Sequence, residues 1–357
     1  MTSTSPSTIG LPEPDAPPVV VVRGRRDRLR RSLLVTSGVG LLAAALFVVT
    51  MMIGDSRLSP WEVIASVIGV SDDGGTNFIV RTLRLPTATT SLFVGLALGV
   101  SGLAFQRLLN NPLASPDFVG ISSGASLFAV IGIISFSLTS FQISLAALVG
   151  AVLTALLIYL LAWRGGITGY RFILIGIGIS EMLRAIIGWV IARAELYDAR
   201  EAMVWLTGSS GRAGAVELRV LIAAVVILVP LALLLSRPLG VLELGDDTAK
   251  GLGVGVEAAR LTVLAIAVVL VALATAAAGP MAFVALIAGP IAVRLQRGAG
   301  LGLLTAAFVG ACIVLAADLV ARHGLPASLP TGVVTGAIGA PYLIWLLVHV
   351  NREGRGG

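Results

Sequence analysis

Two charged side chains stand in the middle of an apolar stretch. Glu181 and Arg184 lie three positions apart within residues 171–192, so on a helix they share one face. A charge at mid-membrane costs about 2.5–3.5 kcal/mol on insertion scales, so both side chains are expected to face protein or water. Two interpretations remain open from the sequence: the pair lines a polar transport pathway, or it is a local ion pair inside a helix bundle.

A second charged pair lies near the end of another apolar stretch. Asp318 and Arg322 are four residues apart, and this spacing predicts a local ion pair. No apolar stretch carries a row of carboxylates, which disfavours a carrier coupled to protons or sodium ions.

The sequence lacks the motifs of ATP-binding and metal-binding enzymes. A Walker A loop requires GxxxxGK[ST], but the single lysine, Lys250, is followed by Gly251. No HExxH or CxxC motif occurs, the two histidines are far apart, and Cys312 has no second cysteine to pair with. We therefore predict a chain that is not an enzyme, has no metal site and carries no cofactor of its own.

The composition is typical of a membrane protein. Of the 357 residues, 57% are hydrophobic and only 12% are charged, about half the charged share of a soluble domain. One span needs about 20 apolar residues, so the chain can supply roughly ten spans. The predicted fold class is all-α, a polytopic membrane protein with about ten transmembrane helices. The net charge of +6 comes from arginines beside apolar runs, so no nucleic-acid binding is expected.

The positions of the apolar runs predict the topology. Ten runs cover residues 33–53, 87–109, 118–138, 142–163, 171–192, 216–236, 260–279, 281–297, 301–321 and 331–350. An even number of spans places both termini on one side. With that side inside, sixteen basic residues are inner and eight are outer, which favours cytoplasmic termini of a multi-pass protein surrounded by membrane lipid. The predicted divisions are a disordered basic tail (1–32), a ten-helix domain (33–350) and a cytoplasmic tail (351–357).

Two polar segments between the runs are predicted to have structure of their own. Residues 59–70 predict an interfacial helix on the outer side, because Pro60 suits a first helical turn. Residues 237–259 are charged and amphipathic, and Gly245 near their middle predicts two short helices with a break between them. Composition alone favours a solvated loop there over a docking element for a cytoplasmic partner.

A longer pattern resembles a known family. Residues 84–126 read RLPTATTSLFVGLALGVSGLAFQRLLNNPLASPDFVGISSGAS, similar to the signature of the iron-siderophore and cobalamin permease subunits of ABC importers. The matching positions beyond the opening RLP and the SG pair are Gln106, Asn111, Pro112, Leu113, Ala114, Pro116 and Gly120. Further similar stretches are LELGDDTAKGLGV (242–254), GPMAFVALIAGP (279–290), DLVAR (318–322) and LPTGVVTGAIGAPYLIWLL (329–347), so the resemblance covers nearly the whole chain after residue 33.

The resemblance also has a departure. Many relatives have Pro-His or Pro-Gln, followed by Arg, where this chain reads GPIAVR at 289–294. The stretches FVALIA and GAPYLIWLL are more similar to the ferric-siderophore branch than to the cobalamin branch.

The resemblance implies a type II ABC importer permease fold and a set of partners. These are a second permease subunit, cytoplasmic ABC ATPase subunits that hold the ATP and Mg, and an extracytoplasmic siderophore-binding protein. It implies that the ATPase contacts a coupling loop at 237–259, with Glu243, Gly245, Asp246, Asp247, Lys250 and Gly251. It also implies that acidic residues of the binding protein dock on Arg81, Arg84 and Arg322. The alternative is that each arginine anchors a helix end at the lipid headgroups, or that Arg322 pairs with Asp318.

The expected function is therefore that of a transmembrane permease subunit. It would move an iron-siderophore complex across the cytoplasmic membrane by alternating access, driven by the separate ATPase. The alternatives are a haem or cobalamin permease of the same family or, in a different class, an ion-coupled secondary carrier that needs no ATPase.

Overall fold

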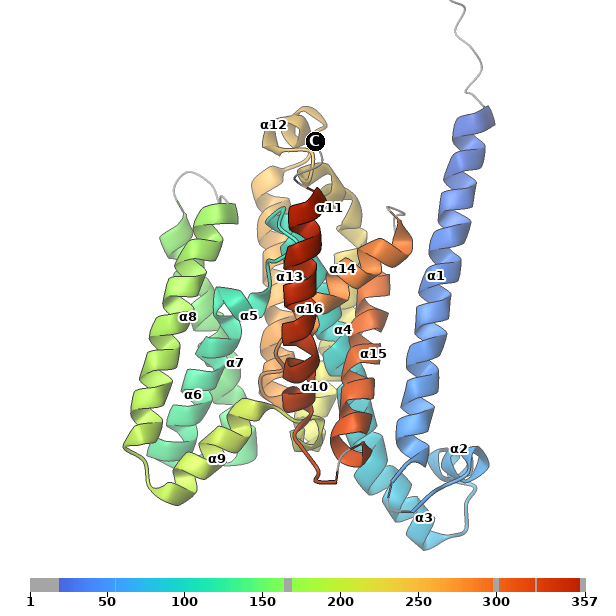
Figure 1. Ribbon diagram of the computed structural model, residues 1–357, viewed down its shortest axis with the longest axis vertical. Helices are drawn as coiled ribbons and strands as arrows, with labels where there is room; N and C mark the ends of the chain where they lie inside the picture. Colours follow the sequence, from blue (N-terminus) through green and yellow to red (C-terminus); the bar gives the residue numbers. More distant parts are fainter. Residues whose placement is uncertain (1–18, 55, 164–168, 298–301, 325, 354–357) are drawn as a thin grey trace, which may run out of the picture.

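The protein is a bundle of helices (Figure 1). The computed structural model describes residues 19–54, 56–163, 169–297, 302–324 and 326–353. Within these ranges there are sixteen α-helices, one short π-helix and one 3-10 helix, and no strand. The predicted all-α class is thus confirmed.

Each of the ten apolar runs contains one long helix. These helices are α1 (Val19–Met52), α4 (Leu85–Leu108), α6 (Ile121–Phe136), α7 (Ser140–Ala162), α8 (Gly169–Ala192), α10 (Ala215–Leu234), α13 (Val256–Ala278), α14 (Val284–Gln296), α15 (Gly302–His323) and α16 (Thr331–Glu353). Seven described helices are long and apolar enough to cross a membrane, whereas α6, α14 and the apolar part of α16 are shorter. At 1.5 Å per residue the 16 residues of α6 span about 24 Å, less than the ~30 Å hydrocarbon core.

The predicted boundaries at the two ends of the chain differ from the structure. Helix α1 begins at Val19, so the described part of the basic tail, residues 19–32, is helical rather than disordered. Its first residue directly follows the last tail proline, and arginine is a good helix former, so the run of arginines extends the helix. At the other end α16 continues to Glu353. The rest of the two tails, 1–18 and 354–357, lies outside the described residues.

Eight shorter segments connect the long helices. They are α2 (Pro60–Ile68), α3 (Gly74–Phe78), η1 (Ile79–Arg84), α5 (Pro116–Val119), α9 (Leu196–Thr207), η2 (Ser210–Arg212), α11 (Ser236–Leu242) and α12 (Asp246–Gly251). The predicted interfacial helix is α2, which Ser59 caps and in which Pro60 is the first residue. Figure 1 shows α2, α3 and α9 at one end of the bundle and α11 and α12 at the other. The first turn of α1 and the last turn of α16 also lie at the α11–α12 end, as an even number of crossings requires.

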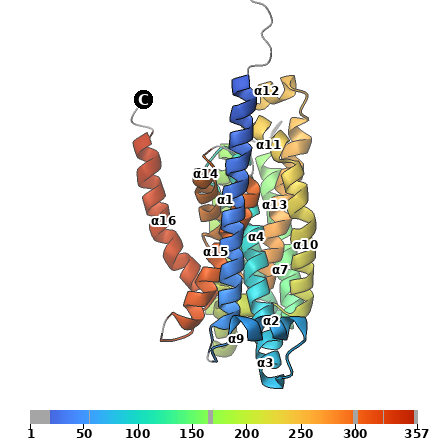
Figure 2. The ribbon, with the colours of Figure 1, turned by 90° about the vertical axis from the view of Figure 1, so that its right-hand side faces the viewer.

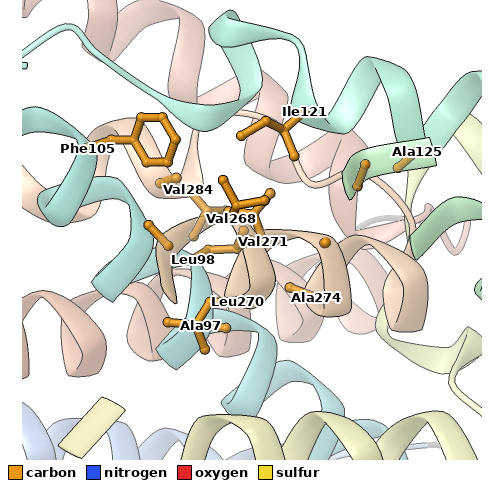
Figure 3. Packing of buried hydrophobic residues seen from close by; sticks show 14 of the residues in the cluster. Ala97, Leu98, Phe105, Ile121, Ala125, Val268, Leu270, Val271, Ala274 and Val284 are labelled. Carbon is orange, nitrogen blue, oxygen red and sulfur yellow. The ribbon is translucent and has the colours of Figure 1, made fainter. Parts of the chain in front are cut away.

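Helix α4 is the centre of the bundle and packs against α10, α13, α14 and α15. Its glycines allow this close approach, because a Cβ at Gly99 would overlap the Ala306 carbonyl and one at Gly102 would overlap the Ala285 carbonyl. The close-up in Figure 3 shows side chains of α4, α6, α13 and α14 meeting in one core. The labelled members are Ala97, Leu98, Phe105, Ile121, Ala125, Val268, Leu270, Val271, Ala274 and Val284.

A buried polar cluster joins α1 to α14 and α15. The Gln296 side-chain amide donates to the Thr36 hydroxyl over 2.9 Å, and the hydroxyls of Thr36 and Thr305 are 2.8 Å apart. Figure 2 shows α1 lying along the bundle, whereas the second half of α16 leans away from it. Most side chains described in α16 are therefore at least partly exposed.

The segment that connects α4 to α6 is not a continuous helix. After α4 the chain runs without regular helix from 109 to 115, forms the single turn of α5, and bends at Gly120, whose φ is +97°. Glycine tolerates this left-handed conformation. Irregular backbone at membrane depth requires protein around it, and Ala114, Ser115 and Val119 are buried accordingly.

A second irregular segment lies between α13 and α14, at residues 279–283. Gly279 and Phe283 have φ of +77° and +68°. The Ser209 backbone N–H donates to the Ala278 carbonyl over 2.7 Å, and the Gly332 N–H donates to the Gly208 carbonyl over 3.1 Å. These bonds tie the ends of α9, α13 and α16 together beside this break.

Candidate functional site

The intramembrane charges predicted on α8 form an ion pair. Arg184 Nη1 is 3.1 Å from Glu181 Oε1, and the Arg184 and Glu181 side chains are 55% and 64% exposed in the single chain. Both lie near the middle of α8, far from either helix end. The local pair predicted as one alternative is therefore present, but it lies on the bundle surface and not inside the bundle.

Arg184 also borders a pocket. The pocket has a volume of about 390 Å³ and lies between α6, α8, the end of α9 and the irregular segment 280–282. Most of its lining is apolar, and its polar residues are Asp117, Ser122, Ser123, Ser126 and Arg184. The two interpretations left open by the sequence are thus compatible, because Arg184 pairs with Glu181 and lines a cavity.

Asp117 is the acidic residue of this pocket. The Ser122 hydroxyl donates to Asp117 Oδ1 over 2.6 Å. The other oxygen, Oδ2, is buried and has no hydrogen-bond partner among the described residues. Behind the wall, the Ser123 and Ser180 hydroxyls are 2.9 Å apart and join α6 to α8.

Asp117 and the three serines were not among the residues predicted from the sequence. A signal was present, since Ser122 and Ser126 are four apart, on one face of a helix that opens with serines. A carboxylate beside an apolar run was a second signal.

The residues of the family signature shape the segment that carries Asp117. The buried Gln106 side chain donates to the Leu286 carbonyl over 3.0 Å and so joins α4 to α14. Asn111 Oδ1 accepts from the Leu113 backbone N–H over 2.9 Å, which closes the turn that contains Pro112. These hydrogen bonds of Gln106 and Asn111 stabilise the fold of the segment and join it to α14.

The remaining signature residues place α5 against α8. Ala114 is buried, and Pro116 is the first residue of α5. A Cβ added at Gly120 would lie 3.2 Å from Ser180 Cβ of α8, so the bend lies directly on that helix.

Residues 237–259, the predicted coupling loop, form two short helices with a break between them, as predicted. Helices α11 and α12 are separated at Gly245, whose φ is +98°. Buried Leu242, Ala249 and Val256 hold the two helices together. Gly251 is the last residue of α12.

The charged residues of this loop fall into two groups. Glu243 is 3.4 Å from Arg107 of α4, and Asp246 is 2.8 Å from Arg260 of α13. These two pairs join the loop to the bundle. Asp247 and Lys250 are exposed. Two exposed leucines, Leu244 and Leu252, lie in the same loop.

Arg81 and Arg84 hold helix ends. Arg81 Nε donates to the Ser66 carbonyl at the end of α2 over 2.6 Å. Arg84 Nη1 donates to the Met51 carbonyl at the end of α1 over 2.9 Å, and its Nη2 donates to the Ser56 carbonyl over 2.6 Å. Both side chains therefore donate to carbonyls at or near the ends of helices, since the last carbonyls of a helix need donors.

Arg322 has a different environment. Its Nε is 3.1 Å from the carboxylate of Asp318, which is fully buried and also accepts from the Thr331 hydroxyl over 2.8 Å. The predicted pair of Asp318 and Arg322 is thus confirmed. Arg322 and Arg84 border the same pocket, of about 380 Å³, together with His323. Arg81 does not line it.

Metal ligands do not gather in the part of the chain that the structure describes. No three His, Cys, Asp or Glu side chains there are placed to share an ion. Cys312 lies in α15 with its Sγ 3.7 Å from the Val39 carbonyl of α1.

Comparison with known proteins places this geometry in a family. The model of the FecCD transport family matches residues 41–349. The chain is 41% identical to the ferric enterobactin transport system permease protein FepG of Escherichia coli (strain K12) over 301 residues, 84% of this chain and 91% of the relative. It is 39% identical to the achromobactin transport system permease protein CbrC of Dickeya dadantii (strain 3937), over 86% of this chain and 89% of the relative.

A solved structure has the same fold. The structure of a metal-chelate type ABC transporter in an inward-facing conformation superposes with a TM-score of 0.76 and 26% sequence identity, covering 89% of this chain and 99% of the other. Family model, relatives and fold agree along nearly the full bundle, and the chain belongs to the FecCD transport family.

Proposed function

We propose that this chain is the permease subunit of an ABC importer that moves a ferric siderophore complex across the cytoplasmic membrane. The observation that carries the proposal is the family match over residues 41–349, which includes all of the bundle except the start of α1 and the end of α16. The two relatives described above are named for ferric enterobactin and achromobactin, and both are permeases. Alternating access of the bundle is the proposed mechanism.

The energy for transport comes from another subunit. The chain has no Walker A loop, so ATP and Mg bind to separate cytoplasmic ABC ATPase subunits. The ATPase subunits bind to the coupling loop at 237–259. Exposed Asp247, Lys250, Leu244 and Leu252 make the contact, while the ion pairs of Glu243 and Asp246 transmit its movement to α4 and α13.

The opposite end receives an extracytoplasmic siderophore-binding protein. Arg322 is the arginine best placed to bind an acidic residue of that partner, because its guanidinium is partly exposed at the mouth of a pocket. Arg84 borders the same pocket and contributes positive charge there, whereas the Arg81 side chain is directed to the end of α2.

A second permease subunit completes the path. The exposed pair of Glu181 and Arg184 lies at mid-helix depth in α8, where contact with lipid would be unfavourable. A second copy or a homologous permease, with water between the two, covers this face.

The proposed topology has both termini in the cytoplasm. It rests on the basic residues of the inner loops and on the position of both described chain ends at the same end of the bundle as α12 (Figure 1). Single cysteines at Ser3 and Gly356, in a Cys312→Ser background, are expected to resist an impermeant thiol reagent in intact cells. Labelling of either position contradicts the topology.

The test of the substrate is an uptake panel. A bacterial strain deleted for its own ferric-siderophore permeases expresses this chain with its ATPase and binding protein, and receives ⁵⁵Fe-labelled catecholate, hydroxycarboxylate and hydroxamate chelates, haem or cobalamin. We expect uptake of a ferric siderophore that disappears when this chain is omitted. Uptake of haem or cobalamin alone overturns the siderophore assignment and leaves an importer of the same family.

A further inference from the structure

Asp117, in the wall of the pocket beside α8, has one carboxylate oxygen that is buried and poorly satisfied. Its Oδ2 has no hydrogen-bond partner within normal distance in the described part of the chain, while its Oδ1 accepts from the Ser122 hydroxyl. A buried carboxylate kept only for structure normally has both oxygens hydrogen-bonded, because an unsatisfied charged acceptor costs more than a neutral one. Asp117 lines an open cavity, and a turn of its carboxyl group would bring the buried Oδ2 to a ligand there.

The same wall carries one positive group. Arg184 pairs with Glu181 through a single contact of 3.1 Å between exposed side chains. An exposed pair of this kind contributes little stability, so the guanidinium can leave Glu181 for a better acceptor at small cost. A guanidinium presents five N–H donors in a planar fork that fits carboxylate and other anionic oxygens.

The rest of the wall leaves room for a ligand. Ser122, Ser123 and Ser126 are small and polar, and a Cβ added at Gly188 of α8 would meet no atom within 4 Å. The volume of about 390 Å³ is within the range of ligand pockets, so a small chelate or one arm of a larger chelate can enter it.

We propose that Asp117 and Arg184 contact the chelate as it crosses the membrane, with an anionic oxygen of the ligand on Arg184 and a ligand N–H or O–H on Asp117. The serines between them provide further hydrogen bonds. The inference rests on the proposed function and adds the chemical class of the ligand: an anionic, oxygen-rich ferric chelate that also carries amide or hydroxyl donors. No covalent step is involved.

The first test separates ligand contact from a structural role. Proteoliposomes contain this chain, its ATPases and saturating binding protein, with a ⁵⁵Fe-labelled chelate from the panel that the wild type imports. We expect Asp117→Asn and Arg184→Gln each to lower uptake per ATP hydrolysed about tenfold, since each loses a charge-assisted hydrogen bond to the ligand. Binding-protein-stimulated ATP hydrolysis and the KM for loaded binding protein are expected to stay unchanged.

Two matched controls belong to this experiment. Glu181→Gln removes the ion pair but keeps Arg184, and Arg193→Gln removes an arginine of the α8 end that stacks on Trp189 at 4.5 Å. Both are expected to transport within about twofold of the wild type, because an exposed ion pair contributes little and Arg193 does not line the pocket.

The second test measures occupancy of the pocket directly. Gly188→Cys, in a Cys312→Ser background, places a thiol at the pocket wall, and Gly178→Cys places one in open space on the same helix but outside the pocket. A hydrophilic maleimide is expected to label Gly188→Cys, and the imported chelate under turnover is expected to slow that labelling. Labelling of Gly178→Cys is expected to be independent of the chelate.

The outcomes are distinct. Ligand contact is overturned if Asp117→Asn and Arg184→Gln behave like the controls, if uptake and ATP hydrolysis fall in parallel, or if the chelate does not protect Gly188→Cys. If the wild-type complex imports none of the ferric chelates, the proposed function itself fails, and the assignment of this pocket fails with it.

Discussion

At the scale of single residues, charge pairs close in sequence were predictable and contacts across the fold were not. The spacings of Glu181 with Arg184 and of Asp318 with Arg322 predicted the pairs that the structure contains. Asp117 was missed because its pocket forms only when α6, α8, the end of α9 and residues 280–282 come together. Likewise, nothing in the spacing of Arg84 predicts that its partners are carbonyls more than 25 residues earlier.

Arg84 is expected to stabilise the protein through these carbonyls. Arg84→Ala leaves the Met51 and Ser56 carbonyls without their charged donor, and we expect a loss of about 2 kcal/mol in unfolding free energy. The measurement is thermal unfolding of the purified protein in detergent. Arg57→Ala, an exposed arginine of the same end, is the control and is expected to change stability by less than about 0.5 kcal/mol. Equal effects of the two substitutions would contradict the anchoring role.

Arg322 is expected to increase the rate at which the loaded binding protein associates with the permease. In Arg322→Gln the amide can still donate to Asp318, so folding is largely kept while the positive charge at the pocket mouth is lost. We expect association with the loaded binding protein to slow by about threefold to tenfold at low salt and to depend less on salt. Surface plasmon resonance of the reconstituted complex measures this, with Arg57→Gln as the control. An unchanged association rate would show that docking takes place elsewhere.

At the scale of elements, apolar runs predicted where helices form but not where they break. Each of the ten runs contains one long helix, and the Gly245 break in the segment 237–259 was also correctly predicted. The bend at Gly120 was missed: the predicted run 118–138 includes the end of α5 and this bend, because a single glycine within an apolar run is compatible with both a helix and a break. The helical start of α1 was missed since charged residues beside prolines were interpreted as disorder.

The outer helix α2 is expected to respond to pH through its capping box. The Ser59 backbone N–H and side chain hydrogen-bond with Glu62 and hold the pKa of the Glu62 carboxyl below its usual value. A lowered folded-state pKa means that this stabilisation is complete above the unfolded-state pKa and is lost as the pH falls through the folded-state value. Hydrogen exchange of residues 60–68 is thus expected to accelerate, relative to its intrinsic rate, as the solution becomes more acidic than the folded-state pKa of Glu62. Glu62→Gln removes the titrating group, and persistence of the same acid response in that variant would refute the assignment.

The coupling loop is expected to depend on the backbone at Gly245. Its φ of +98° is unfavourable for a β-branched residue, so Gly245→Val is expected to misalign α11 and α12 while membrane insertion stays normal. Co-purification of the ATPase and stimulated ATP hydrolysis measure the effect, and both are expected to fall several-fold. Gly240→Val is the control, because Gly240 lies within α11, where its Cβ would meet no atom. Full stimulated hydrolysis in Gly245→Val would argue against coupling through this loop.

At the scale of the whole molecule, composition and the number of spans predicted a polytopic all-α membrane protein. The partners were predicted from the family resemblance alone. The bundle has charged or polar surfaces at three places. The predicted coupling loop lies at one end, the pocket bordered by Arg84 and Arg322 lies at the other, and the pocket beside α8 lies between them. This order matches the proposed route of energy and ligand through a permease. The proposed second chain would cover the exposed ion pair on α8, and the exposure of this pair could not be predicted from its spacing.

The central claim is that this chain transports only when a separate ATPase hydrolyses ATP. The most direct measurement is ⁵⁵Fe-chelate uptake into proteoliposomes that hold the chain with wild-type ATPase or with an ATPase whose Walker A lysine is replaced, each with and without an imposed proton or sodium gradient. The account predicts uptake with ATP and the wild-type ATPase alone, and none with the substituted ATPase under any gradient. Uptake driven by an ion gradient without ATP hydrolysis would contradict it and identify a secondary carrier.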